Sequence, residues 1–98
     1  MNKDYILSVI REYADEYLRE PRRHLPKGCF EKRSYQLWTI EELLKHTEEY
    51  GEASPIEAVM EFVHRMDRFS RKKGKAGFIF SIAHDVAGDI LDMLLAMR

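Results

Sequence analysis

The stretch that decides the fold is FIFSIAHDVAGDILDMLLAM, residues 78–97. Placed at about 100° per residue, its apolar positions cover roughly two-thirds of the circumference of a helix. A helix with so wide an apolar face either lies at the centre of a bundle or shares one flank with a second copy of the chain. One histidine and three aspartates within it argue against a membrane span, so the stretch predicts a core helix.

Three more helices are predicted upstream of this one. Apolar residues that recur at spacings of three and four predict helices over residues 4–19 and 34–50. The segment Ser54-Pro55-Ile56-Glu57 combines a serine N-cap with a proline at the first helical position. This signal predicts a third helix over residues 55–73.

The connections are less clearly marked than the helices. Pro21, Pro26 and Gly28 predict a loop over residues 21 to about 30, and we therefore place the start of the second helix at Ser34. Thr39, followed three residues later by a glutamate, is an alternative start because this spacing is typical of a capping box. The run GKAG at residues 74–77 predicts a flexible connection that ends the third helix before the fourth begins.

The fold class that follows is all-α, in a single helical domain over residues 1–98. Short connections favour antiparallel neighbours, which predicts an up-down-up-down four-helix bundle with the fourth helix the most buried. The hydrophobic share of 45% and the charged share of 34% suit a folded domain with a solvated surface. Cys29 is the only cysteine and the first residues lack a secretory apolar run, so we expect a cytoplasmic protein.

Cationic residues are concentrated in two segments, residues 19–33 and 65–75, which hold 12 of the 16 lysines and arginines. In an up-down-up-down bundle both segments fall at one end, called the basic end here, although the net charge is −1. Such a surface attracts phosphates, nucleic acid or an acidic partner, and the alternative is that the charges are only solvated. The candidate anion-binding residues are Arg22, Arg23, Arg68, Arg71, Lys72, Lys73 and Lys75. Glu48, Glu49 and Glu52 are expected at the opposite, acidic end.

Three titratable residues have both a structural and a functional interpretation. His84-Asp85 resembles the dyad of HD-type metal phosphohydrolases, but the other ligands that such a site needs are not recognisable. By its angular position His84 lies at the border of the apolar arc, which favours a hydrogen-bonded histidine over a metal ligand. Asp67 falls within the apolar arc of the third helix, so we expect a buried carboxylate paired with an arginine or tyrosine of another helix.

A second enzyme-like feature is the spacing of carboxylates. The segments IEELL at 40–44 and GDILDMLL at 88–95 resemble, in texture, the magnesium-binding segments of MazG-like nucleotide pyrophosphatases. Only Glu49 with Glu52 and Asp89 with Asp92 keep the carboxylate spacing of that family, and the first of these pairs runs into the predicted helix end at Gly51. The resemblance implies an all-helical magnesium enzyme, but Glu41 lacks the carboxylate three residues further on that the pattern requires. No catalytic residue, metal ligand or cofactor is predicted from it.

Several segments together resemble a wider group. They are ASPIEAV at 53–59, MDRF at 66–69, and FIFSIAHD at 78–85 continuing into DILD at 89–92. In these segments the chain resembles short uncharacterised all-helical proteins from Gram-positive gut bacteria. That resemblance implies a bacterial cytoplasmic origin and brings no activity, cofactor or site.

The function that we expect is a small, non-enzymatic helical interaction domain whose partner is a second copy or another protein. The over-wide apolar face of the last helix motivates this expectation. Tyr35 and Trp38 fall off the apolar stripe of the second helix, which is consistent with an exposed aromatic pair, but we favour ordinary burial against the loop after the first helix. The alternatives are binding of an anion or nucleic acid at the basic end, and a carboxylate-dependent magnesium enzyme. The candidate interface residues are Trp38, Phe80, Leu91 and Leu95.

Overall fold

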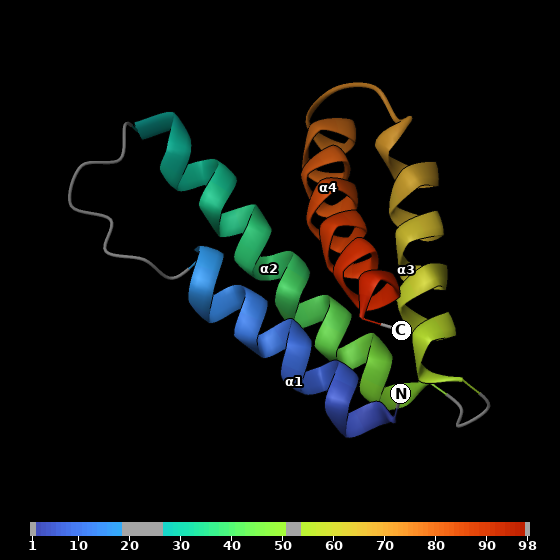
Figure 1. The fold of residues 1–98 in the computed structure, drawn as a ribbon. Coiled ribbons are helices and arrows are strands. Elements are labelled where there is room, and N and C mark those ends of the chain that lie inside the picture. Colours follow the sequence, from blue (N-terminus) through green and yellow to red (C-terminus); the bar gives the residue numbers. More distant parts are fainter. Residues whose placement is uncertain (1, 19–26, 51–53, 98) are drawn as a thin grey trace.

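The computed structural model describes residues 2–18, 27–50 and 54–97, which are mostly helical (Figure 1). None of these residues forms a β-strand, which confirms the all-helical prediction. The elements are α1 (Lys3–Tyr13), the π-helix η1 (Ala14–Leu18), α2 (Lys27–Glu49), α3 (Pro55–Ser70) and α4 (Lys75–Ala96).

The starts of α1 and α3 differ in how they are capped. The Asn2 side chain accepts a hydrogen bond from the Tyr5 backbone N–H at 2.8 Å and caps α1. Ser54 is the extended N-cap of α3 with Pro55 in the first turn, as predicted, although the serine hydroxyl makes no capping bond. Helix α3 ends at Ser70, three residues earlier than predicted.

The prediction for the start of the second helix is wrong. Helix α2 begins at Lys27, so residues 27–30 are helical and not loop, while residues 21–26 lie outside the described residues. A glycine in a helix costs about 1 kcal/mol, which the packing of a 23-residue helix against its neighbours can offset. The alternative start at Thr39 is also wrong, because Thr39 lies inside the helix and its buried hydroxyl donates to the Tyr35 carbonyl at 2.7 Å.

The turn between α3 and α4 is shorter than the sequence suggested. Helix α4 begins at Lys75, three residues before the predicted start, so residues 75–77 form its first turn. Gly74 alone takes the left-handed conformation that the turn requires, with φ of 80°. Gly77 is buried and lies against the Lys72 carbonyl, where a side chain would collide with it. The two glycines therefore serve a tight corner and not a flexible linker.

Helix α4 packs extensively against α3 and also contacts α2 and α1, while α1 lies beside α2 (Figure 1). The two ends of the described chain lie close together, because the Tyr5 hydroxyl is 3.2 Å from the Met97 sulfur. Among the described residues, no helix has both the length and the apolar composition that crossing a bilayer requires. The fully buried large side chains are Ile6, Ile10, Thr39, Ile40, Leu43, Thr47, Val59, Ile90 and Leu94.

Candidate functional site

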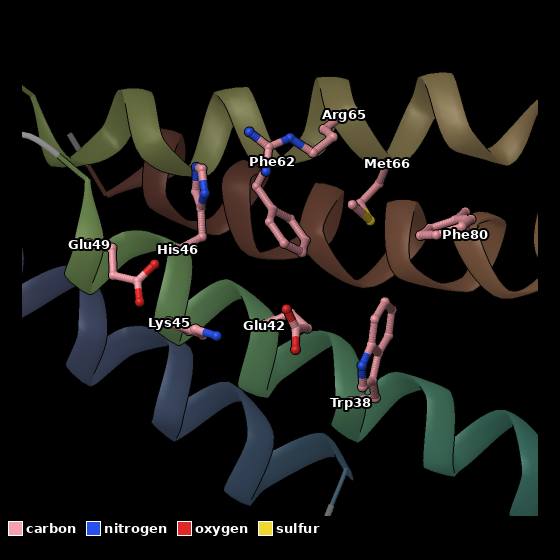
Figure 2. Close-up of a pocket in the computed structure, with 9 residues that line it drawn as sticks. All are labelled: Trp38, Glu42, Lys45, His46, Glu49, Phe62, Arg65, Met66 and Phe80. Carbon is pink, nitrogen blue, oxygen red and sulfur yellow. The ribbon is translucent and has the colours of Figure 1, made fainter.

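A hollow of about 350 Å³, called the α2–α3 groove here, lies between α2 and α3 with α4 beneath it (Figure 2). Side chains from one face of α2 form one wall, those of α3 form the other, and Phe80 comes from α4. The groove extends for three turns along α2, from Trp38 to Glu49, or about 16 Å. The lining residues are Trp38, Glu42, Lys45, His46, Glu49, Phe62, Arg65, Met66 and Phe80.

A series of aromatic rings in mutual contact begins at one end of the groove and extends past it along α2 and α4. The ring of Phe80 lies 6.2 Å from Trp38 and 5.0 Å from Phe69, measured between centroids. One turn earlier on α2, Tyr35 meets Phe78 edge to face at 6.4 Å. We call these five residues the aromatic row. Phe78 is 53% exposed and Trp38 is 36% exposed, so the row presents apolar surface to solvent.

The walls of the groove carry charge. Glu42, Lys45 and Glu49 are exposed along α2, while Arg65 on α3 is held by Glu61 at 2.8 Å. His46 lies between the walls with its ring near Phe62, at 5.8 Å. Its buried Nε2 atom has no hydrogen-bond partner among the described residues, and the nearest carboxylate oxygen is 3.9 Å away. The groove thus combines an apolar floor with polar groups that a partner can meet.

The α3–α4 corner lies against the first half of α2. Lys75 Nζ is 3.6 Å from Glu31 Oε1, and the Tyr35 hydroxyl donates to the same oxygen at 3.1 Å. The Tyr35 hydroxyl, and then Glu31, raise the pKa of Lys75, so its ammonium stays charged. This contact places the start of α2 beside the cationic run at residues 71–75.

The candidate cations of the basic end differ in what they meet. Arg71 pairs with Asp67 at 3.2 Å, and Lys72 lies over the Phe69 ring at 5.0 Å. Arg68 and Lys73 are exposed and have no ion-pair partner in the described part of the chain. Arg22 and Arg23 lie outside the described residues, as does Glu52 of the predicted acidic end. At that end Glu48 is not free, because Arg11 pairs with it at 3.5 Å.

The candidate interface residues fall in two places. Trp38 and Phe80 both line the groove, whereas Leu91 and Leu95 lie on one flank of α4. Most of the wide apolar arc of α4 is covered within the chain itself, and Leu91 is half-buried against that core. Leu95 is 40% exposed. The apolar surface left open on α4 is therefore smaller than the arc in the sequence suggests.

The titratable residues singled out in the sequence do not assemble into one site. The expectation for Asp67 is wrong, because it is half-buried and its partner is not on another helix but is Arg71, four residues later at the C-cap of α3. His84 Nδ1 lies 3.9 Å from Asp85 Oδ1 at the surface. Glu49 lines the α2–α3 groove, whereas Asp89 and Asp92 line a different hollow. In the described ranges no three histidine, cysteine or carboxylate residues lie close enough to hold a metal ion.

Sequence reasoning missed the groove itself. Phe62 and Met66 are buried, and the spacing of apolar residues along α3 does not indicate that these two border an open hollow. His46 stands three residues after Leu43 and four before Tyr50, on the side of α2 that faces α3. This spacing is the one feature of the sequence that indicates a histidine between the two helices. No family model, curated protein or solved structure matches the chain. Function therefore rests on the geometry of the molecule.

Proposed function

We propose that this protein is a small, non-enzymatic helical interaction domain that self-associates, with a second copy covering the aromatic row and the α2–α3 groove. The observation that carries this proposal is the row itself, in which Phe78 and Trp38 are exposed beside a hollow with an apolar floor. Aromatic residues are enriched at the centres of protein interfaces, where they bring large contact area at a low cost in conformational entropy.

Charge complementarity favours a second copy as the occupant. The α2 wall of the groove exposes Glu42 and Glu49 with Lys45 between them, a net negative charge, whereas the corner near Phe78 exposes Lys72 and Lys73. In a two-fold interface the same patch is used by both copies. Acidic side chains from each copy can therefore face the cations of the other while each Phe78 enters the partner's groove.

Two finer expectations accompany this proposal. We infer an up-down-up-down order of helices, supported by the short corner between α3 and α4 and by the contact of α1 with α2. A cytoplasmic location is inferred from the single cysteine, which excludes an intramolecular disulfide.

The proposal is tested by the variant Phe78→Glu, examined by sedimentation velocity beside the wild-type protein. Placing a charge at the centre of the interface is expected to cost about 2 kcal/mol or more, which is roughly a 30-fold weaker self-association. Because Phe78 is more than half exposed in one copy, the variant should keep its helical circular dichroism spectrum.

Leu95→Glu is the matched control, since it puts the same charge on an exposed residue of the same helix, outside the groove. It should sediment like the wild-type protein. If Leu95→Glu dissociates while Phe78→Glu stays associated, the groove is not the interface. That result would instead place the interface on the flank of α4 that carries Leu91 and Leu95.

Binding of an anionic polymer at the basic end is a second candidate function. The specific observation that favours it is that Arg68 and Lys73 are exposed without an ion-pair partner in the described part of the chain, with Lys72 between them. Cations that are not neutralised within the chain are available to phosphates.

If this second function holds, a single-stranded oligonucleotide should bind with an affinity that falls steeply as salt rises. The triple variant Arg68→Gln, Lys72→Gln and Lys73→Gln should reduce the slope of log K against log salt concentration by about 2, since each phosphate contact contributes about 0.7. Arg11→Gln, which removes a cation elsewhere on the surface, should leave the slope unchanged. Absence of binding at low salt would exclude this function.

A further inference from the structure

A second hollow, of about 460 Å³, is independent of the α2–α3 groove. It lies where the end of α1 and the π-helix η1 meet α2 and the later turns of α4. Asp89 in this hollow and Phe80 in the groove are nine residues apart on α4, which places them on opposite faces of that helix. We call it the tyrosine pocket, and its lining residues are Tyr13, Tyr17, Leu18, Arg33, Gln36, Asp89, Asp92 and Met93.

Two tyrosine rings form the apolar part of the pocket. Tyr13 and Tyr17 lie one turn apart, with ring centroids 5.1 Å apart and planes inclined at 45°. Tyr13 is almost fully buried, whereas Tyr17 is 51% exposed. The chain between them leaves α-helical geometry for the wider π-helical turn of Ala14–Leu18, a local distortion that is frequent at functional sites. The pocket therefore offers aromatic surface to a ligand from solvent.

Carboxylates form the polar part. The Tyr13 hydroxyl donates a hydrogen bond to Asp89 Oδ2 at 3.3 Å, and Asp92 is exposed one turn further along α4. Burial of Tyr13, and then the charge of Asp89, raise the pKa of the phenol to about 12, so the hydroxyl stays a neutral donor. Arg33 is the only cation among the described residues of the lining, and its Nη1 donates to the Tyr17 carbonyl at 2.7 Å.

The charge of the lining decides which ligands suit it. Among the described lining residues, two carboxylates against one guanidinium leave a net negative charge, which disfavours phosphates and other anions. Aromatic rings attract cations through the negative potential of their faces, and carboxylates nearby add to that attraction. A metal ion would instead need several oxygen ligands close together, and Asp89 already accepts a hydrogen bond from Tyr13.

We propose that the tyrosine pocket binds a small organic ammonium ion, with the ammonium group between the tyrosine rings and the carboxylates of Asp89 and Asp92. The volume of the pocket suits a ligand of this size, since small-molecule sites begin at about 300 Å³. The exposed Tyr17 ring contributes the cation–π contact. Asp89 accepts a hydrogen bond from Tyr13, whereas Asp92 accepts none from a described tyrosine, so its carboxylate is available to the ammonium group.

The experiment is a titration of the protein with choline, compared with 3,3-dimethylbutan-1-ol, which has the same shape without the charge. Isothermal titration calorimetry gives the affinity, and amide chemical shifts in two-dimensional NMR locate the site. Choline should bind at least about tenfold more tightly than the neutral alcohol and should shift the amides of residues 13–18 and 89–93.

Two variants with one matched control assign the contacts. Tyr17→Leu removes the exposed ring and should weaken choline binding about fivefold, and Asp92→Asn should weaken it about threefold to fivefold. Asp85→Asn removes an exposed carboxylate from the same helix outside the pocket and should leave the affinity unchanged. Circular dichroism of each variant checks that the fold is retained.

Other outcomes would overturn the proposal. Equal affinity for choline and the neutral alcohol would show that the charge is not recognised. Equal losses of choline affinity in Asp92→Asn and Asp85→Asn, or chemical-shift changes confined to residues outside the pocket, would place the ligand elsewhere. Displacement of choline by millimolar Mg²⁺ would also contradict the proposal. The last result would mean that the carboxylates hold a metal ion instead.

Discussion

Leu94→Ala is expected to lower the free energy of unfolding by about 2–5 kcal/mol, which is the usual cost of emptying a leucine-sized space in a packed core. Leu94 is fully buried and lies near the end of α4, where the helix closes the core. A domain of this kind has a total stability of about 5–15 kcal/mol, so the loss is a large share of it. Urea denaturation followed by circular dichroism measures the change.

The neighbouring residue supplies the control for this prediction. Leu95 is 40% exposed, so Leu95→Ala removes the same atoms from the adjacent position with little loss of packing. It should change the stability by less than about 1 kcal/mol. Equal losses of stability in Leu94→Ala and Leu95→Ala would contradict the prediction. They would mean that the end of α4 does not pack against the core through Leu94.

Gly77→Ala is expected to destabilise the protein by about 1–3 kcal/mol, the range found when a packed position is overfilled. An alanine Cβ at this position would overlap the Lys72 carbonyl oxygen, which is backbone and belongs to the tight turn before α4. The substitution therefore forces the α3–α4 corner to open. Thermal or urea denaturation measures the loss.

Gly88→Ala makes the same chemical change in the middle of the same helix. A Cβ at position 88 would meet nothing within 4 Å, and alanine favours helix over glycine by about 1 kcal/mol. This variant should therefore be more stable than the wild-type protein. Opposite signs at residues 77 and 88 are the expected result, and destabilisation by both would contradict the described course of the corner.

The sequence predicts the parts of this fold that depend on local signals. The start of α3 follows from Ser54 and Pro55, because a proline fits the first turn and stops a helix from beginning earlier. The inward face of α4 follows from the spacing of its apolar residues, from Ile82 to Leu94. These features need no knowledge of the neighbouring helices.

The misjudged features include a helix start, a local ion pair and the hollows between helices. Pro26 and Gly28 predict a loop locally, but α2 continues back to Lys27 and includes Gly28. Asp67 lies within the apolar arc of α3 in angle, but its partner is a local residue, Arg71 at the C-cap of α3. Hydrophobic spacing gives the face of each helix and not the gap between two helices, so neither the α2–α3 groove nor the tyrosine pocket was predictable.

The most direct measurement of the central proposal is the fluorescence of Trp38 on dilution, because the chain has one tryptophan and it lines the α2–α3 groove. If a second copy covers the groove, the emission maximum should move to longer wavelength as the protein is diluted from about 1 mM to about 1 μM, a range that spans weak to moderate association. Phe78→Glu should show the long-wavelength emission at every concentration. An emission maximum that stays constant in the wild-type protein and equals that of Phe78→Glu throughout would contradict the account.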